Sequence, residues 1–152
     1  MSHILLIDDD PSTLGSLSRA FRLAGHETTV ADSAARAADL LRNQKFDCIL
    51  SDVVMPGKDG ITLLEEIRAM QITTPVIMIS GQATVDMAVR ATRLGALDFL
   101  EKPLSTEKLL LAIDNAVRLT RLEAENRELR RQVGSHEIVW RSEPMRRVMA
   151  QV

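Results

Sequence analysis

Several charged or hydroxyl side chains follow short apolar runs of the chain, at points where buried strands would end. A carboxylate can act as a nucleophile toward phosphorus, and clustered carboxylates attract a hard cation such as Mg²⁺, which takes few protein ligands and keeps several waters. Ammonium and hydroxyl groups can neutralise and orient a phosphoryl group. All three kinds of group stand at such points: Asp8, Asp9, Asp52, Ser80 and Lys102.

Each of these residues also has an ordinary structural explanation. Asp8, Asp9 and Asp10 are typical of a solvated turn, with Asp10 as the cap of a helix that begins at Pro11. Asp52 precedes a Pro-Gly turn and is able to start an Asx-turn. A chemical role therefore depends on whether the fold brings these groups to one place.

Apolar runs alternate with segments of helical periodicity along the chain. The expected strands are His3–Ile7, Glu27–Ala31, Asp47–Ser51, Pro75–Ile79 and Leu97–Leu100. Each of the first four helices has an expected inward face. These faces are Leu14, Leu17, Phe21 and Ala24 in the first helix, and Ala34, Ala37, Ala38 and Leu41 in the second. They are Ile61, Leu64 and Ile67 in the third helix, and Val85, Ala88, Val89 and Thr92 in the fourth. Helix starts are marked by Asp10, Ser33 and Asp59, and helix ends by Gly25 and Gly95.

This alternation predicts an α/β fold, a flavodoxin-like (βα)₅ doubly wound parallel sheet with strand order 2-1-3-4-5 and an extended C-terminal helix. In that order the winding reverses between strands 1 and 3, and ligands bind in the crevice at this switch point. Strand 1 leads into Asp8 and Asp9, and strand 3 leads into Asp52. The three carboxylates are therefore expected to share one crevice.

The residues at these strand ends resemble the receiver domain of bacterial two-component response regulators. The similar segments are Ile4–Asp10, Ser51–Gly60, Ile79–Gly81 and Asp98–Pro103. The resemblance covers a domain expected at residues 1–118. It implies that a sensor histidine kinase transfers a phosphoryl group to Asp52. It implies a regulatory domain and not an enzyme, with Mg²⁺-dependent self-phosphorylation from a phosphodonor and self-dephosphorylation as its only reactions.

The same resemblance implies a metal site. Asp9 and Asp52 would bind Mg²⁺ directly, and Asp8 would act mainly through water. The backbone carbonyl of Val54 would be the third protein ligand.

It also implies a switch. Lys102 would contact the phosphoryl group, and Ser80 would move toward it. Phe99 would change its rotamer with Ser80, and because it has no hydroxyl, this change would depend on packing alone. A cis peptide bond is implied before Pro103, because the free-energy cost of the cis form is small only for the bond that precedes a proline.

The helical pattern continues past the receiver, and residues 119–134 are expected to form a dimerisation linker. Core positions a and d of a heptad pattern are held by Leu119, Leu122, Asn126, Leu129 and Val133. The flanking charges would pair Arg118 with Glu123 and Glu125 with Arg130 across a homodimer. A buried Asn pair favours a parallel, in-register dimer. The alternative is one amphipathic helix lying on its own domain, since the repeat covers only about two heptads.

Residues 135–152 resemble the opening of the AAA+ ATPase domain of NtrC-type, sigma-54-dependent activators. The segment has the pattern of a strand, a Ser-Glu-Pro turn and a helix start, with Arg141 where many of these proteins have Gly. No Walker A pattern occurs in the chain, so it is not itself the ATPase. The resemblance implies a longer activator that engages sigma-54 RNA polymerase and DNA.

The composition is that of an ordinary soluble domain. A net charge of −2 over 152 residues offers no general case for nucleic-acid binding, and Arg146 with Arg147 is typical of a solvated helix face. No apolar stretch of spanning length and no signal peptide occur, so we expect a cytoplasmic protein that binds neither membrane nor, through this segment, nucleic acid. The single cysteine, Cys48, is expected in the core.

Two other functions remain open from these features. A small flavodoxin-like metal- or nucleotide-binding enzyme domain would use the same crevice, although no Gly-rich phosphate loop follows the first strand. A purely structural dimerisation module would need only the last helix. Mg²⁺-dependent labelling by acetyl phosphate separates both from a receiver.

Overall fold

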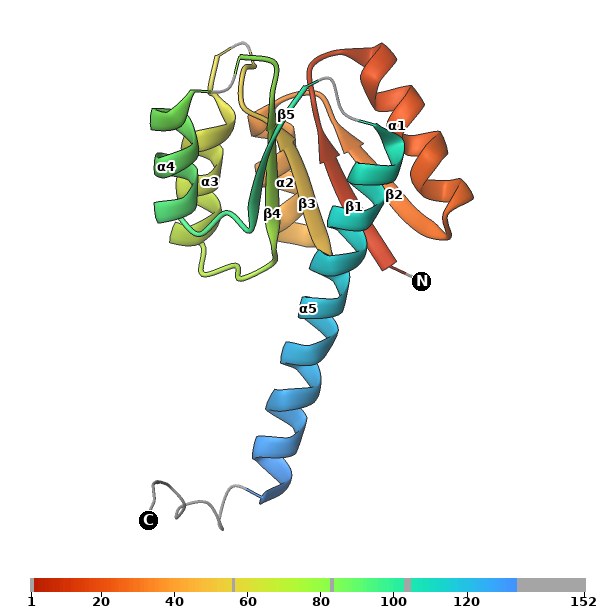
Figure 1. Cartoon of the computed structure of the whole chain (residues 1–152). Helices are drawn as coiled ribbons and strands as arrows, with labels where there is room; N and C mark the ends of the chain where they lie inside the picture. The colour runs from red at the N-terminus through yellow and green to blue at the C-terminus, as the bar shows by residue number, and fades with distance from the viewer. Residues whose placement is uncertain (1, 56, 83, 103–104, 134–152) are drawn as a thin grey trace. The chain divides into compact units, whose positions relative to one another are not determined.

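The computed structural model describes residues 2–55, 57–82, 84–102 and 105–133; of Ala124 and of residues 126–133 it describes the backbone alone. Five parallel strands form one sheet in the order β2-β1-β3-β4-β5, with helices on both faces (Figure 1). The strands are β1 (Ser2–Ile7), β2 (His26–Ala31), β3 (Cys48–Asp52), β4 (Val76–Ser80) and β5 (Asp98–Glu101). The helices are α1 (Pro11–Leu23), α2 (Ala34–Asn43), α3 (Gly60–Ala69), α4 (Val85–Arg93) and α5 (Thr106–Val133). The predicted fold class and strand order are confirmed.

The sheet is buried on both faces because successive side chains of a strand enter two different cores. One core lies beneath α1 and α5 and contains Ile4, Leu6 and Cys48; the other lies beneath α2, α3 and α4. Cys48 is fully buried as predicted, and this burial, with a smaller effect of the nearby Asp47 charge, raises the pKa of its thiol to about 12. A thiol in that state is a core group and not a nucleophile.

Polar caps fix the starts of the first four helices. Asp10 accepts a hydrogen bond from the backbone N–H of Ser12 at 3.0 Å, and Ser33 and Asp59 cap α2 and α3, as predicted. The hydroxyl of Thr84 caps α4, which was not predicted. Two glycines with φ of +93° follow α1 and α4, in the left-handed conformation that ends many helices: Gly25 and Gly95.

The inward faces of α1, α2 and α3 are largely the predicted ones. Ala34, Ala37, Ala38 and Leu41 of α2 are buried, as are the two isoleucines and Leu64 of α3. In α1, Leu14 and Phe21 are buried, whereas Ala24 is exposed because it is the C-cap residue and lies past the last helical turn.

The inward face of α4 differs from the predicted one. Val85 and Val89, which were expected in the core, are 79% and 41% exposed. Ala91 is the buried residue of α4, and Met87 and Leu94 pack partly against the same core. Both sets of residues have helical spacing, so periodicity alone does not choose between them.

At its C-terminal end, α4 is hydrogen-bonded to Arg68 of α3. The guanidinium donates to the carbonyl oxygens of Leu94 at 3.3 Å and Gly95 at 2.8 Å. It also donates to those of Ile72 at 2.8 Å and Thr74 at 3.1 Å, ahead of β4. The bonds to Leu94 and Gly95 satisfy carbonyl groups at the end of α4, of the kind that helix ends leave free.

The chain divides into two compact units, Met1–Thr120 and Arg121–Val152. In the first unit α5 contributes Leu109 and Ile113 to the core beneath α1. The backbone of α5 continues as helix to Val133 in the second unit. The strand, turn and helix start predicted within residues 135–152 lie outside the described residues. No helix of the described part has the length and apolar character needed to span a bilayer.

Candidate functional site

Three carboxylates meet at the carboxyl edge of the sheet. Asp8 and Asp9 follow β1, and Asp52 ends β3, the adjacent strand. Each offers an oxygen that lies within 4.8 Å of the other two. Asp8 and Asp52 are only 3% and 8% exposed, whereas Asp9 faces solvent. The structure therefore brings the three predicted acids into one crevice at the switch point.

Lys102, just after β5, lies between two of these carboxylates. Its Nζ is 3.4 Å from Asp8 Oδ2 and 3.3 Å from Asp52 Oδ2. Burial alone would lower the pKa of this lysine, but the two carboxylates outweigh that effect and raise its pKa above the ordinary 10.5. The side chain is thus charged at neutral pH and offsets part of the repulsion between the acids.

The carboxylate of Asp8 is not fully compensated. Burial raises its pKa above the ordinary 3.8, and the charge of Asp52 adds to this effect. The backbone N–H of Asp10, which donates to Asp8 Oδ1 at 3.0 Å, and the ammonium of Lys102 act in the opposite direction without reversing the shift. A further cation would therefore stabilise the cluster.

The donor set fits Mg²⁺. The carboxylates are hard oxygen ligands within reach of one ion, and the exposed side of the cluster at Asp9 leaves room for the waters that Mg²⁺ retains. Val54, predicted to supply a backbone carbonyl, lies two residues after Asp52, and its N–H donates to Asp52 Oδ1 at 3.3 Å. This turn holds the Val54 backbone beside the carboxylate.

Ser80 and Phe99 project from the same face of the sheet. Ser80 ends β4 and is fully buried, and its Oγ accepts a hydrogen bond from the backbone N–H of Gln82 at 3.1 Å. Phe99 of β5 is the register partner of Met78, two residues before Ser80, and it packs partly against the core beneath α4. Pro103, where a cis bond was predicted, lies outside the described residues.

Two features of the loop between β3 and α3 were not predicted. The N–H of Gly60 donates to the Val53 carbonyl at 2.7 Å, and a Cβ on this glycine would overlap the Asp52 carbonyl oxygen. Lys58 forms an ion pair with Glu66 of α3. The sequence signal for both is weak, because glycine after a turn is common and the charged residues are eight positions apart, outside helical pair spacing.

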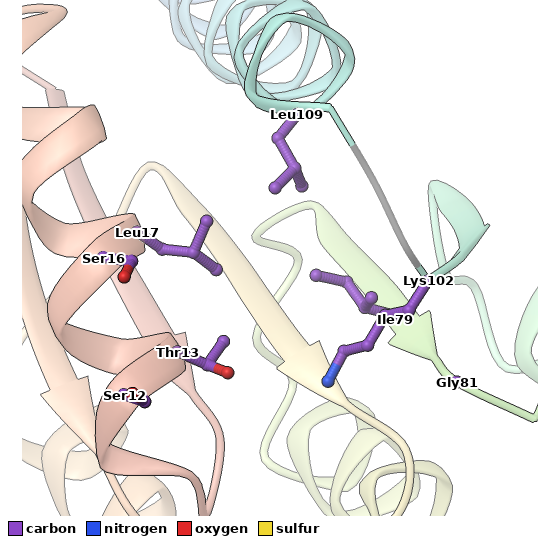
Figure 2. Close-up of a pocket in the computed structure, with 8 residues that line it drawn as sticks. All are labelled: Ser12, Thr13, Ser16, Leu17, Ile79, Gly81, Lys102 and Leu109. Carbon is purple, nitrogen blue, oxygen red and sulfur yellow. The ribbon is translucent and has the colours of Figure 1, made fainter.

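A cavity of about 580 Å³ opens beside Lys102. Figure 2 shows the ammonium group of this lysine directed toward the α1 wall of the cavity. The other residues that line the cavity are Ser12, Thr13, Ser16, Leu17, Ile79, Gly81 and Leu109. A molecule entering between α1 and β4 would therefore meet Lys102.

Comparison with known proteins identifies a family. Residues 4–114 match the family model described as the response regulator receiver domain. That range contains the three acids, Ser80, Phe99 and Lys102.

Curated relatives include transcriptional regulators from several bacteria. The chain is 42% identical over 116 residues to the transcriptional regulatory protein FixJ of Bradyrhizobium diazoefficiens, covering 76% of the chain and 57% of that protein. It is 37% identical over 156 residues to the C4-dicarboxylate transport transcriptional regulatory protein DctD of Pseudomonas aeruginosa, covering 99% of the chain and 34% of that protein. The chain thus spans only part of the length of these relatives.

Solved structures agree in fold. A CheY-like response regulator receiver domain protein from Methanospirillum hungatei superimposes with a TM-score of 0.78 at 27% identity, covering 81% of the chain and 98% of that structure. Full-length FixJ from B. japonicum gives a TM-score of 0.76 at 37% identity, covering 88% of the chain and 66% of that structure.

Proposed function

Because the chain belongs to the family of response regulator receiver domains, we propose that it is a phosphorylation-dependent switch in which Asp52 accepts the phosphoryl group. The observation that carries this proposal is the position of Lys102, with its Nζ 3.3 Å from an Asp52 oxygen and 3.4 Å from an Asp8 oxygen. A fixed cation at this point would neutralise a phosphoryl group on Asp52 as it neutralises the carboxylates.

The proposed donor is a phosphohistidine of a sensor histidine kinase. One Asp52 carboxylate oxygen forms a bond to phosphorus while the P–N bond to the donor imidazole breaks. The imidazole takes up a proton as it leaves, and an acyl phosphate remains on Asp52. Attack by a water oxygen on the same phosphorus breaks the bond to Asp52 and returns the free carboxylate, which is self-dephosphorylation.

The proposed metal is Mg²⁺, held directly by Asp9, Asp52 and the backbone carbonyl of Val54, with Asp8 acting mainly through water. When bound, it would supply positive charge that offsets the carboxylates and the phosphoryl oxygens. The raised pKa of Asp8 supports this assignment, because it means that Lys102 alone does not compensate the buried charge.

The proposed switch uses Ser80 and Phe99. A phosphoryl group adds negative charge and strong acceptor oxygens beside Ser80. Ser80 would give up the Gln82 N–H and donate its hydroxyl to a phosphoryl oxygen, and Phe99 would repack beneath α4. The shallow burial of α4, in which Val85 and Val89 stay exposed, supports such a change because little packing opposes it.

The proposed output lies in the last helix and beyond. Residues 119–134 would form a parallel homodimer through Leu119, Leu122, Asn126, Leu129 and Val133, and residues 135–152 would begin an AAA+ domain. The match to DctD along 99% of the chain supports this reading, and so does the exposure of the first two leucines, 40% and 52%. The full-length protein would act in the cytoplasm on sigma-54 RNA polymerase and DNA. A small flavodoxin-like enzyme gains no support from the family match.

Labelling with radioactive acetyl phosphate tests the phosphoacceptor. The whole chain should incorporate label that requires Mg²⁺ and is released by hydroxylamine, as an acyl phosphate is. Asp52→Asn should incorporate none, because an amide oxygen is a poor nucleophile. Asp39→Asn is the matched control, since Asp39 is an exposed acid on α2 paired with Arg42, and it should label as the wild type does. Hydroxylamine-sensitive label on Asp52→Asn would contradict the assignment.

A further inference from the structure

We propose that Arg68 makes the C-terminal end of α4 a fixed pivot, so that the phosphorylation switch displaces this helix from its N-terminal end. The inference rests on the proposed function, in which Phe99 repacks beneath α4. Phe99 packs partly against the same core as Met87 and Leu94 of α4, so a change at Phe99 reaches this helix through a shared core. How the helix responds depends on where it is held.

Arg68 joins the end of α4 to two other segments of the chain. Its Nε and Nη2 donate to the carbonyl oxygens of Leu94 at 3.3 Å and Gly95 at 2.8 Å. Its Nη1 donates to those of Ile72 at 2.8 Å and Thr74 at 3.1 Å, ahead of β4. Because the guanidinium group is planar and rigid, the four bonds fix the distance between the two pairs of carbonyls. The turn after α4 is therefore attached both to α3 and to the segment that leads into β4.

Two further features strengthen this attachment. Gly95 has φ of +93°, and a Cβ there would lie 3.1 Å from Arg68 Nε, so a residue without a side chain lets the guanidinium approach the turn. Just beyond the turn, the N–H of Leu97 donates to the Val76 carbonyl of β4 at 2.8 Å. The last turn of the helix also carries Ala91, which is fully buried. The C-terminal end of α4 is thus held by both α3 and β4.

The N-terminal end of α4 is held more weakly. Val85 and Val89 are 79% and 41% exposed. The cap at this end is local, because the hydroxyl of the exposed Thr84 accepts a hydrogen bond from the N–H of Met87 in the same helix. A hinge motion about the C-terminal end would keep the bonds of Arg68, whereas sliding of the whole helix would break them.

Distances between two spin labels in the whole chain test the pivot. One label is placed at Asp86→Cys in the first turn of α4 or at Arg93→Cys in its last turn. The other is a reference on Asp39→Cys of α2 or on Arg19→Cys of α1, both exposed positions. The native Cys48 is fully buried and has a thiol pKa of about 12, so it stays unlabelled. With beryllofluoride and Mg²⁺ in place of a phosphoryl group, the distances to position 86 should shift. Those to position 93 should stay within the width of their original distributions.

A lysine in place of Arg68 separates the fork of hydrogen bonds from the charge. Arg68→Lys keeps the positive charge but presents a single ammonium group, which cannot span all four carbonyls. Position 93 should then shift with beryllofluoride as position 86 does. Arg90→Lys makes the same exchange at an exposed residue of α4, and it should leave the wild-type pattern unchanged.

A ¹⁹F NMR signal of bound beryllofluoride separates failure of the inference from failure of the proposed function. A wild type that does not bind beryllofluoride refutes the phosphoacceptor, and the inference falls with it. With beryllofluoride bound, equal shifts at positions 86 and 93 mean that the whole helix slides, and no shift at either means that it stays in place; both overturn the pivot alone. A position 93 that stays fixed in Arg68→Lys also overturns it. The wild-type distances decide by themselves where that variant does not fold.

Discussion

Asp8 carries a buried negative charge that folding makes unfavourable. Burial raises the pKa of Asp8 above 3.8 in the folded protein, so the folded state holds the proton of Asp8 more tightly than the unfolded state does. The stability that this proton contributes is fully present below pH 3.8 and is lost as the pH rises through the folded pKa. Asp8→Asn, neutral at every pH, should therefore unfold at higher urea than the wild type in the presence of EDTA, by roughly 0.5–2 kcal/mol. The advantage should grow from about pH 4 to pH 7.

Mg²⁺ provides the control for this substitution. It should stabilise the wild type by mass action and leave Asp8→Asn much less affected, because a ligand oxygen charge is missing. Urea unfolding curves with and without MgCl₂ measure both effects. A variant that is less stable than the wild type in EDTA at pH 7 would show that the Lys102 contact outweighs the cost of burial.

The charged residues of the crevice were predictable, whereas two other charged side chains were not. Asp8, Asp52 and Lys102 follow apolar strands, and parallel strands bring their carboxyl ends to one edge. The bonds of Arg68 go to backbone carbonyls of two other segments, so no residue type marks its partners. The partner of Lys58 is set by the path of a loop and not by a repeating period.

At the scale of elements, Gly60 lets the start of α3 lie directly against the end of β3. A Cβ there would overlap the Asp52 carbonyl oxygen and lie 2.8 Å from Met78 Cε. Gly60→Ala should destabilise the protein by about 1–3 kcal/mol, because two packed elements must separate. It should also slow labelling by acetyl phosphate, since the displaced atoms belong to the residue that carries the phosphoryl group.

Gly15 in α1 is the matched control for Gly60. It is an exposed helical glycine, and a Cβ there would meet nothing within 4 Å. Gly15→Ala should stabilise the protein by about 0.5–1 kcal/mol through helix propensity and leave labelling unchanged. Urea unfolding and initial labelling rates measure both substitutions. Equal effects of the two would mean that loss of glycine as such, and not contact with β3, determines the outcome.

The helices and strands could be predicted from the sequence where only one set of apolar residues was available for burial. β3 and β4 are buried along their whole length and apolar up to their polar last residues, and their boundaries differ from the predicted ones by one residue. In α4 two apolar faces compete, with Val85 and Val89 on one and Ala91 with Leu94 on the other. Which of the two faces is buried depends on the elements packed against α4, and no local pattern contains that information.

At the scale of the whole molecule, the first unit holds the complete acid cluster, and the second holds the helix proposed to read it out. The first unit, Met1–Thr120, contains every residue of the crevice and both cores. The length of the relatives extends well beyond this chain, since it covers 57% of FixJ and 34% of DctD. A switch in the first unit needs a connection to the proposed output in the second, and α5 is the element shared by both units.

That connection leads to a prediction about oligomeric state. Sedimentation equilibrium of the whole chain should give a dimer at micromolar concentration, and a chain ending at Thr120 should give a monomer. Leu122→Glu should weaken the dimer about a hundredfold or more, because it would place two unpaired charges against each other in an apolar seam. Leu111→Glu alters another exposed leucine of the same helix, 63% exposed against 52% for Leu122 and within the first unit, so it should leave the dimer intact. A whole chain that is monomeric at this concentration would contradict the linker proposal, and a dimer broken by Leu111→Glu but not by Leu122→Glu would move the interface to the first unit.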